Sequence, residues 1–371
     1  MTVRDSAGGG ELPEGFLDLP HEVYRDDPNW IPEDRDAVAM RFSASNTWFE
    51  YGEGHAFSVP RRTRAAAFRT RDLVVDGVPA AFFGYWESLG DQDADADVMD
   101  AVRAWAREHG AVRLFGPINF STASDYRVRL WDAGGGDERP LIGEPYNPAS
   151  YPAQLEALGF QVRYRFYTYV LDVDDIRKLH DDKRELLDEA RARGYRFEPL
   201  TVERWLDCVH GIYDAANAAF QDNFAFVPFT REQFEAHFDA SWAATLHPDA
   251  SVIVYGPAGD VAGCFMIYPD YAPLAVQAAG DSRVPVTRLN FPEHGALLDP
   301  LGVVFKTGAI HPDHRRANLA HAMTADAARR AREAGATTLY GGLIREDNPS
   351  GRVYKSGWTG QRWYALYAAD V

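Results

Sequence analysis

Cysteine is scarce in this sequence. Among its 371 residues there are only two, Cys208 and Cys264. Two cysteines are too few for a disulfide framework, and they lack the paired spacing of a metal-binding motif. Both lie in apolar segments, where cysteine commonly serves as a small core residue. We therefore expect no disulfide-stabilised fold, no metal site and no cysteine nucleophile.

Positive charge is also in short supply. The 38 Lys and Arg residues face 55 Asp and Glu residues, so the formal net charge is −17. A surface this acidic repels the phosphates of nucleic acids and of anionic membranes. We therefore expect neither of them as a partner. The charge is compatible with a cationic small molecule, such as an amine.

Long apolar runs are absent too. No stretch approaches the roughly 20 apolar residues that span a bilayer. Residues 1–10 are polar and rich in glycine, without the basic start and apolar core of a secretory signal. We expect a cytoplasmic protein. With 46% hydrophobic residues the chain can build ordinary cores, and its length suggests two domains.

The most informative segment is a basic turn at the start of a helix. A strand-like run, residues 302–310, leads into a turn with Arg315 and Arg316, and an alanine-rich amphipathic run follows at 321–335. The first N–H groups of a helix have no partner within it, and the helix dipole favours negative charge there. The pattern predicts a binding site for a diphosphate. The structural alternative is a helix N-terminus with two solvated arginines.

A second motif follows this turn. After a strand-like run at residues 337–343 come Asn348, a short helical segment with Tyr354, and the pair Gly357-Trp358. Residues 363–367 are typical of a last strand. For Tyr354 the structural alternative is a half-buried aromatic residue packed on a sheet.

These two motifs, in this order, resemble GCN5-related N-acetyltransferases. In that family a turn of the form Arg/Gln-x-x-Gly-x-Gly/Ala grips the diphosphate of coenzyme A. Arg315 matches its first position and Ala320 its last, while Asn318 stands where glycine is usual. Asparagine is among the residues that best tolerate the positive φ that glycine allows. The resemblance implies that the acyl-CoA is contacted by Ala309, Ile310, Arg315, Arg316, Ala317, Asn318, Leu319, Ala320 and Asn348.

The resemblance also implies a chemistry. Acetyl-CoA or another acyl-CoA is the expected co-substrate, and a small-molecule amine attacks its thioester directly. A backbone N–H near Ala309 or Ile310 is expected to hold the oxyanion, and Tyr354 to protonate the leaving thiolate. Some base must leave the amine neutral. Glu346 is the candidate base, with Asp347 and His311 as alternatives; each is also compatible with a solvated loop residue.

The chain shows weak internal similarity. An Asn-Pro pair at 147–148, a short helical segment, Gly159-Phe160 and a strand-like run at 164–171 repeat the pattern that ends the chain. We predict an α/β (α+β) fold of two tandem domains of this family. Each is expected to be a mixed, mostly antiparallel twisted sheet flanked by helices.

The expected organisation has four parts. Residues 1–14 are expected to be disordered, 15–171 to form the first domain, 172–194 a helical linker, and 195–371 the domain with the acyl-CoA site. The first domain is not expected to bind CoA, because the acidic run 91–97 precedes its helix at 98–109 and would repel a diphosphate.

The whole layout is similar to a group of bacterial proteins with two acetyltransferase-like halves. In similar proteins the loop that carries Asn223 and Phe224 overlies the acceptor pocket. Asn119, Ser121 and Asp125 of the first half are further candidates to face that pocket. Turn chemistry after Gly116-Pro117 is their structural alternative.

Two other functions stay open. Tandem halves of this kind also occur in transferases of the peptidoglycan-bridge type, which take an amino acid from aminoacyl-tRNA. The strong acidity of the chain argues against a tRNA surface. A catalytically silent acyl-CoA binder is the other alternative.

Overall fold

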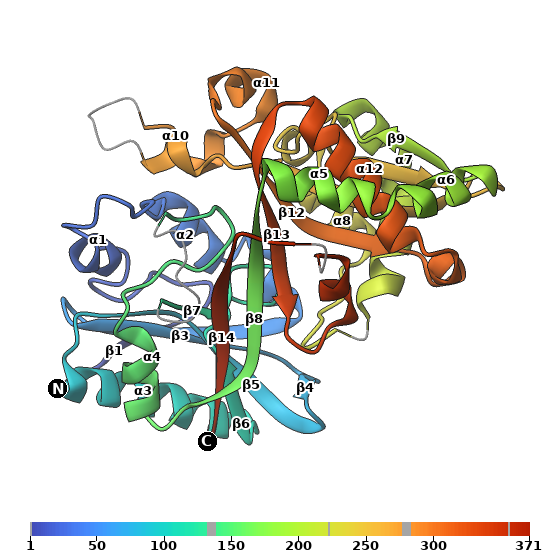
Figure 1. Ribbon diagram of the computed structural model, residues 1–371. Coiled ribbons are helices and arrows are strands. Elements are labelled where there is room, and N and C mark those ends of the chain that lie inside the picture. The colour runs from blue at the N-terminus through green and yellow to red at the C-terminus, as the bar shows by residue number, and fades with distance from the viewer. Residues whose placement is uncertain (1, 132–138, 222, 277–282, 355–356) are drawn as a thin grey trace.

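The computed structural model describes residues 2–131, 139–221, 223–276, 283–354 and 357–371 (Figure 1). Its strands form one mixed, mostly antiparallel sheet with helices against its faces. Along the sheet the strand order is β1-β2-β3-β5-β6-β14-β8-β13-β12-β11-β10-β9, with β4 paired to β5 and β7 paired to β14.

The first half of the chain supplies one end of this sheet. Its strands are β1 (Arg4–Ala7), β2 (Gly52–Val59), β3 (Thr63–Thr70), β4 (Val74–Val75), β5 (Val78–Ser88), β6 (Arg113–Gly116), β7 (Val128–Leu130) and β8 (Gln161–Asp172). Its helices are α1 (Leu19–Val23), α2 (Arg35–Phe42), η1 (Thr47–Glu50), α3 (Gln92–Glu108) and α4 (Tyr151–Ala157).

The second half supplies the other end. Its strands are β9 (Arg196–Pro199), β10 (Val252–Tyr255), β11 (Val261–Pro269), β12 (Leu301–Ile310), β13 (Ala336–Arg345) and β14 (Gly360–Asp370). The longer helices are α5 (Val173–Asp181), α6 (Arg184–Ala192), α7 (Val202–Phe220), α8 (Arg231–His237) and α12 (Leu319–Glu333). Short helical segments are α9 (Ala240–Ala243), α10 (Ala272–Val276), η3 (Val286–Arg288), α11 (Phe291–His294), η4 (Gly295–Leu297), η5 (Pro312–Ala317) and η6 (Pro349–Tyr354).

The two halves repeat one order of elements. In each, an antiparallel hairpin leads to a long strand, then a helix, then a strand parallel to the previous one: β5-α3-β6 in the first half and β12-α12-β13 in the second. A short helix and a long strand end each half, as α4-β8 and η6-β14. The predicted fold class, two tandem α/β halves, is confirmed.

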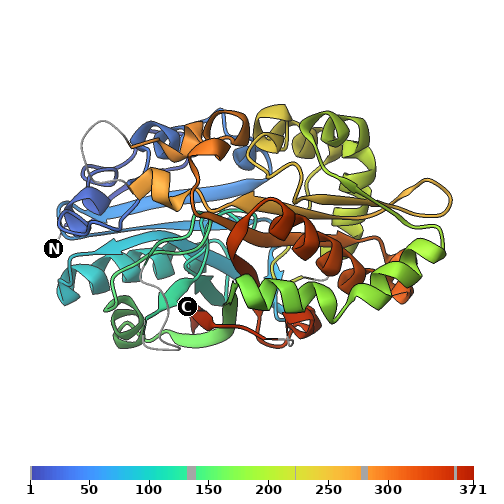
Figure 2. The ribbon, with the colours of Figure 1, turned by 45° about the horizontal axis from the view of Figure 1, so that its top comes forward.

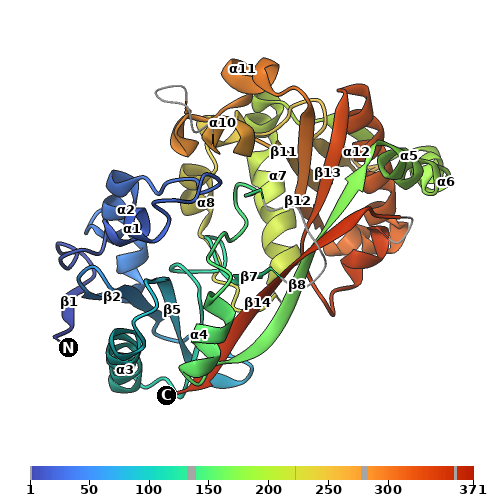
Figure 3. The same cartoon turned by 60° about the vertical axis from the view of Figure 1, so that its left-hand side comes forward.

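The long final strands join the halves. β14 runs antiparallel to β8 and also pairs with β6 of the first half, from Tyr367 to Asp370. β8 pairs in turn with β13 of the second half, from Phe166 to Asp172. Figures 1 and 3 show both strands passing through the centre of the molecule. Neither half is therefore completed by its own strands alone.

In the second half, successive side chains along a strand point to opposite faces of the sheet, and each face has its own hydrophobic core. In β11 the side chains of Cys264 and Met266 pack with the core under α7, while those of Phe265 and Ile267 pack with the core under α12. The helices α5 and α6, which fill the segment expected to be a helical linker, lie alongside α12 (Figure 2). Thus α7 and α12 cover opposite faces of the same strands.

Two local predictions need correction. The predicted disorder over residues 1–14 is wrong for Arg4–Ala7, which pair with β2. The helix expected at 98–109 begins earlier, at Gln92, because the Asp91 carboxylate accepts a hydrogen bond from the N–H of Ala94 at 3.1 Å and caps it. Most of the acidic run therefore lies inside the helix. No helix in the described ranges has the length and apolar character needed to cross a membrane.

Candidate functional site

The sheet opens between β12 and β13. These parallel strands are paired from Leu301 and Ala336 as far as Phe305 and Gly341, and no further. Beyond that point β12 stays paired with β11 up to Ile310, while β13 continues along β8. The two strands therefore diverge, and the second half of β12 faces a gap.

The ladder between β11 and β12 decides which amides face this gap. The N–H of His311 donates to the carbonyl of Ala262 at 2.9 Å. In an antiparallel ladder, alternate residues exchange both backbone bonds with the partner strand. Ala309 is therefore bonded to β11, whereas the backbone groups of Gly308 and Ile310 point into the gap. Of the two predicted oxyanion donors, Ile310 is well placed and Ala309 is turned away.

A tight turn connects β12 to α12. It passes through the 3-10 helix η5 and through Asn318, which has φ 56° and ψ 26°. Asparagine thus adopts here the left-handed conformation that glycine most readily provides. The N–H groups of Leu319 and Ala320 have no acceptor among the described residues. Their side chains differ: Ala320 lies on a cavity wall, while Leu319 and the neighbouring Ala317 are buried in the core and offer only backbone.

Side chains outside the turn hold it in place. The His314 ring lies between Asp260 and Tyr195, with Nε2 2.8 Å from the carboxylate and Nδ1 3.0 Å from the hydroxyl. Arg193 donates to the carbonyl of Ala317 at 3.1 Å. The turn is therefore held by the connection between α6 and β9 and by the hairpin between β10 and β11.

Of the two predicted arginines, Arg315 has a described side chain and Arg316 does not. Arg315 is exposed on the cavity wall, and its guanidinium donates a hydrogen bond to the carbonyl of Ala219 at 3.4 Å. No carboxylate among the described residues pairs with it. Arg316 lies in the same turn, but its side chain is outside the described part of the structure.

Tyr354 ends a short helix that Asn348 begins. The Asn348 side chain accepts a hydrogen bond from the N–H of Ser350 at 2.9 Å. The Tyr354 ring is 4% exposed and packs beside Tyr169, with 5.5 Å between ring centres. Its hydroxyl has no hydrogen-bond partner in the described part of the chain. Burial raises the pKa of Tyr354 above its ordinary value, so the hydroxyl stays protonated at neutral pH.

A cavity of about 830 Å³ joins these features. It passes through the gap in the sheet, from the N-terminus of α12 on one face to α7 on the other. Of the residues predicted from the sequence, it brings together Ile310, Arg315, Ala320, Asn348, Tyr354, Asn223, Phe224 and Asp125.

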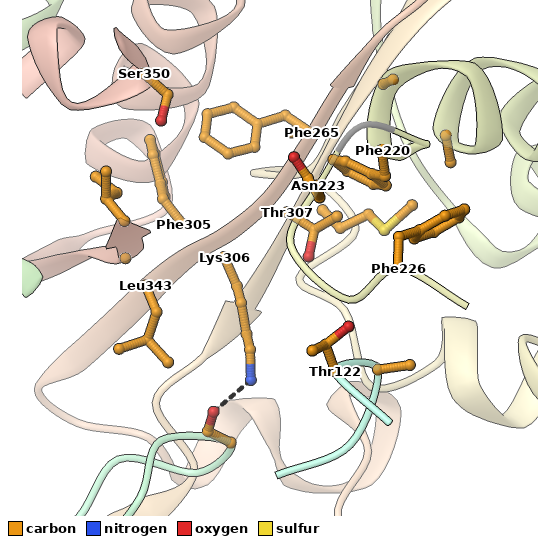
Figure 4. Close-up of a pocket in the computed structure, with 18 of the residues that line it drawn as sticks. Thr122, Phe220, Asn223, Phe226, Phe265, Phe305, Lys306, Thr307, Leu343 and Ser350 are labelled. Carbon is orange, nitrogen blue, oxygen red and sulfur yellow. Dashed lines mark hydrogen bonds between the residues drawn. The ribbon is translucent and has the colours of Figure 1, made fainter. Parts of the chain in front are cut away.

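The side of the cavity that α7 covers is lined by aromatic residues. This side of the cavity lies between the two halves of the chain. The aromatic residues of this wall are Tyr213, Phe220, Phe224, Phe226, Phe229, Phe238, Trp242 and Tyr268. The loop after α7 rests on the first half, where Thr122 donates to the carbonyl of Ala225 at 3.3 Å and Phe224 packs on Phe115 and Tyr164. Figure 4 shows Thr122, Asn223 and Phe226 around this space.

Nine predicted residues with described side chains do not line the cavity: Asn119, Ser121, Ala309, His311, Ala317, Asn318, Leu319, Glu346 and Asp347. The Asn119 side chain accepts the N–H of Tyr85 at 2.7 Å, and the Ser121 hydroxyl accepts that of Ala123, so both serve their own loop. Residues 122–127 of that loop line the cavity instead. Glu346 is exposed at the end of β13 and, unlike Arg345 and Asn348 beside it, is not part of the wall.

No family model matches the chain. A curated relative, Protein YghO of Escherichia coli strain K12, is 22% identical over 226 residues, which are 60% of this chain and 57% of that protein. The aligned part is thus less than two thirds of that relative.

Two solved structures match nearly the whole chain. A tandem GNAT protein from the clavulanic acid biosynthesis pathway covers 100% of this chain and 98% of its own, with a TM-score of 0.51 and 11% identity. A GCN5-related glucosamine N-acetyltransferase region of a fungal multi-domain β-N-acetylglucosaminidase covers 99% of this chain and 38% of its own, with a TM-score of 0.52 and 15% identity. This chain has the tandem GNAT fold.

The two GNAT halves differ at corresponding places. In the N-terminal half β5 and β6 also separate, after Phe82 and Phe115. There the Glu87 carboxylate accepts a hydrogen bond from the Tyr151 hydroxyl at 2.6 Å, and Arg62 forms an ion pair with Asp91 at the start of α3. Burial raises the pKa of Glu87 to about 7. In this half, acidic groups with their own partners thus lie at the places that correspond to the cavity wall of the C-terminal half.

Sequence reasoning missed four of the five Lys and Arg side chains described on the cavity wall: Arg41, Arg127, Lys306 and Arg345. Lys306 had a visible signal, because it is one of only four lysines and interrupts an apolar strand. Arg127 had none, since its position depends on how the halves meet. No group of three or more His, Cys, Asp or Glu side chains able to hold a metal occurs among the residues that the structure describes.

Proposed function

We propose that the protein is an acyl-CoA-dependent N-acyltransferase that acts on a small-molecule amine. The observation that carries this proposal is the cavity through the diverging strands, whose wall combines unpaired backbone groups of β12, the turn before α12 and the Tyr354 hydroxyl. In this proposal only the C-terminal half binds acyl-CoA. Acidic groups and internal partners at the start of α3 support that restriction.

The proposed donor site has two parts. The N–H groups of Leu319 and Ala320, together with the Arg315 guanidinium, provide hydrogen bonds and positive charge for a diphosphate. The backbone groups of Gly308 and Ile310 provide an unpaired strand edge in the gap, to which an amide-containing chain adds as a further strand would. In this proposal the thioester end lies toward Tyr354.

The proposed transfer is direct. The amine nitrogen attacks the thioester carbonyl carbon, a C–N bond forms, and the oxyanion accepts a hydrogen bond from a gap-facing N–H, that of Gly308 or Ile310. The C–S bond then breaks. The departing thiolate takes up the proton that the amine nitrogen loses, so the products are an amide and the free thiol of CoA. Neutral Tyr354 donates a hydrogen bond to the sulfur, and its raised pKa keeps that proton in place at neutral pH.

Turnover with defined donors tests this proposal. Purified protein is incubated with acetyl-CoA or longer acyl-CoAs and a panel of amines, and both free thiol and acylated amine are measured. The proposal predicts one N-acylated product for each thiol released. Binding of CoA without any product would favour a silent binder, and transfer only from aminoacyl-tRNA would favour the peptidoglycan-bridge type of activity.

A further inference from the structure

The wall of the cavity is basic although the protein is acidic. Asp125 is the one carboxylate among the described wall residues, whereas five basic groups lie there: Arg41, Arg127, Lys306, Arg315 and Arg345. The chain as a whole carries a formal net charge of −17. Positive charge concentrated in a cleft of an acidic protein attracts an anionic ligand. Arg315 stands at the turn before α12, and other cations lie on the far side of the gap.

Arg127 is a buried cation that has no carboxylate partner among the residues the structure describes. Its residue is 7% exposed, and its guanidinium lies over the rings of Tyr126 and Phe166, at 3.3 Å and 3.9 Å from their centres. Its hydrogen bond goes to the Tyr126 hydroxyl, and its Nε has no partner. Because a buried unpaired charge is costly, such a group indicates a ligand that completes its hydrogen bonds. Burial lowers the pKa of Arg127 to about 10, which leaves it charged at neutral pH.

Lys306 points into the same space from β12. It sits at a bulge: Phe305 and Thr307 have partners on β11, and Lys306 between them has none. A bulge re-aims a side chain. Figure 4 shows the Lys306 side chain extending from the strand toward the first half, where Nζ donates to the carbonyl of Gly143 at 2.6 Å. That acceptor is neutral, and no carboxylate in the described ranges lies within ion-pair distance of Nζ.

The carboxylates near Arg127 and Lys306 do not cancel the positive charge of these two side chains. Glu144 is buried, accepts hydrogen bonds from Thr168 and Tyr364, and lies 3.9 Å from Arg362. Its carboxylate therefore already has three neighbours, and its charge also attracts Lys306 and Arg127. Asp125 is exposed on the cavity wall and attracts Lys306 over a longer distance. An ammonium or amine group suits Asp125, and a carboxylate suits the two cations.

The two cations are separate from the proposed diphosphate site. Lys306 precedes Ile310 by four residues, which is about 13 Å along an extended strand. Lys306 also lies in the strand where the pairing with β13 ends, whereas Arg315 lies beyond the other end of β12. A single diphosphate therefore does not serve both places.

We propose that the acceptor is an aminocarboxylate with an apolar or aromatic body, and that Arg127 and Lys306 bind its carboxylate. This inference rests on the proposed acyltransferase function, because that function makes the α7 side of the cavity the acceptor side. The aromatic wall holds the body of the molecule, and its amine faces the gap. Lys306 is in this proposal a specificity residue for the acceptor, and the transfer chemistry does not depend on its titration.

A pair of matched probes tests the anion site directly. Calorimetry measures the binding of 4-phenylbutyrate and of its neutral analogue 4-phenylbutyramide, with and without saturating CoA. The carboxylate is expected to bind at least ten times more tightly than the amide. Lys306→Met is expected to weaken carboxylate binding by about 10-fold to 100-fold and to leave amide binding unchanged. Arg345→Met is the control, because Arg345 is a wall cation that already has Asp347 at 2.5 Å.

The results distinguish a failure of the proposed anion site from a failure of the proposed acyl-CoA site. Equal binding of the two probes, no binding of either, or an equal loss of both in Lys306→Met would overturn the anion site. Failure of CoA to bind while the carboxylate preference persists would instead count against the donor assignment. Arg127→Met is tested in the same way after its fold is checked by circular dichroism. Lys306 is exposed in the cavity, so its variant keeps the test valid if Arg127→Met does not fold.

Turnover gives a second measure. L-phenylalanine and phenethylamine share an aromatic body and an amine, and only the first has a carboxylate. If both are acylated, the wild type is expected to prefer the amino acid in kcat/KM, and Lys306→Met to lose that preference by lowering the value for the amino acid alone. A fall of equal size for both amines would show that Lys306 acts in the chemistry or in the fold, which contradicts the proposal.

Discussion

Gly341→Ala is the substitution that tests the position of Tyr354 most sharply. Gly341 lies on β13 where its pairing with β12 ends, and the Tyr354 ring packs directly on it. An ideal Cβ at Gly341 lies 2.5 Å from Cε1 and 2.6 Å from Cζ of that ring, and 3.0 Å from its hydroxyl oxygen. Carbon atoms in contact prefer about 3.5 Å or more, so the ring must move by about 1 Å.

A shift of this size is small for the fold and large for catalysis. Overpacking of a core costs about 1 to 3 kcal/mol, which a protein of this size tolerates. Misplacement of a catalytic group by about 1 Å lowers a rate by about 100-fold. Gly341→Ala is therefore expected to lower kcat by about 10-fold to 100-fold, while the Kd for CoA changes less than threefold.

The assay is thiol release under saturating acyl-CoA, with CoA binding measured separately. Gly360→Ala on β14 is the matched control, because its added Cβ meets only Val170, at 3.9 Å. In a Tyr354→Phe background, Gly341→Ala is expected to cost little more, since both changes then act on the same hydroxyl. Full activity of Gly341→Ala, or a full additional loss in the Phe background, would refute the assigned role of Tyr354.

Two further predictions concern titratable groups. Tyr354→Phe alone is expected to lower kcat by about 10-fold to 100-fold without weakening CoA binding, as steady-state rates and calorimetry would show; a change in Kd alone would count against it. Glu87 has its pKa raised from 4.5 to about 7, so its contribution to stability is complete below pH 4.5 and is lost as the pH rises through 7. Urea unfolding should then show wild type losing stability relative to Glu87→Gln between pH 5 and pH 8, by at most about 1.4 kcal/mol per pH unit. Parallel pH profiles would contradict this.

Much of the fold was predictable because its signals are local. The strand before Arg315, the turn and the helix after it form a continuous pattern, and the structure places β12, η5 and α12 there. The tolerance of Asn318 for positive φ followed from its side chain, and φ is 56°. The repeat of Asn-Pro, short helix and strand indicated two halves, and the strand order confirms them.

The exchange of final strands was not predictable from such patterns. β8 and β14 have the same aromatic, alternating character, so either is compatible with either half. Their pairing is decided by contacts between distant parts of the chain, and those contacts also bring the loop with Arg127 against the cavity.

The orientation of single backbone groups was equally hidden. Ala309 and Ile310 are neighbours in sequence. Only the register with β11 shows that, of these two residues, Ile310 is the one whose backbone groups face the gap. Asn119 was a reasonable candidate by type, but its amide is needed to satisfy the backbone of Tyr85. Glu346 has suitable chemistry but does not line the cavity. These outcomes depend on geometry at the level of one residue, which residue type does not encode.

The binding of CoA itself tests the central claim most directly. Isothermal titration of the purified protein with CoA is expected to show one site per chain, and Arg315→Glu is expected to weaken binding at least tenfold by replacing an attraction for the diphosphate with a repulsion. Arg345→Glu, on the same cavity wall but away from the turn before α12, is the control and is expected to bind CoA as the wild type does. Absence of binding at millimolar CoA, or equal affinity of wild type and Arg315→Glu, would contradict the account.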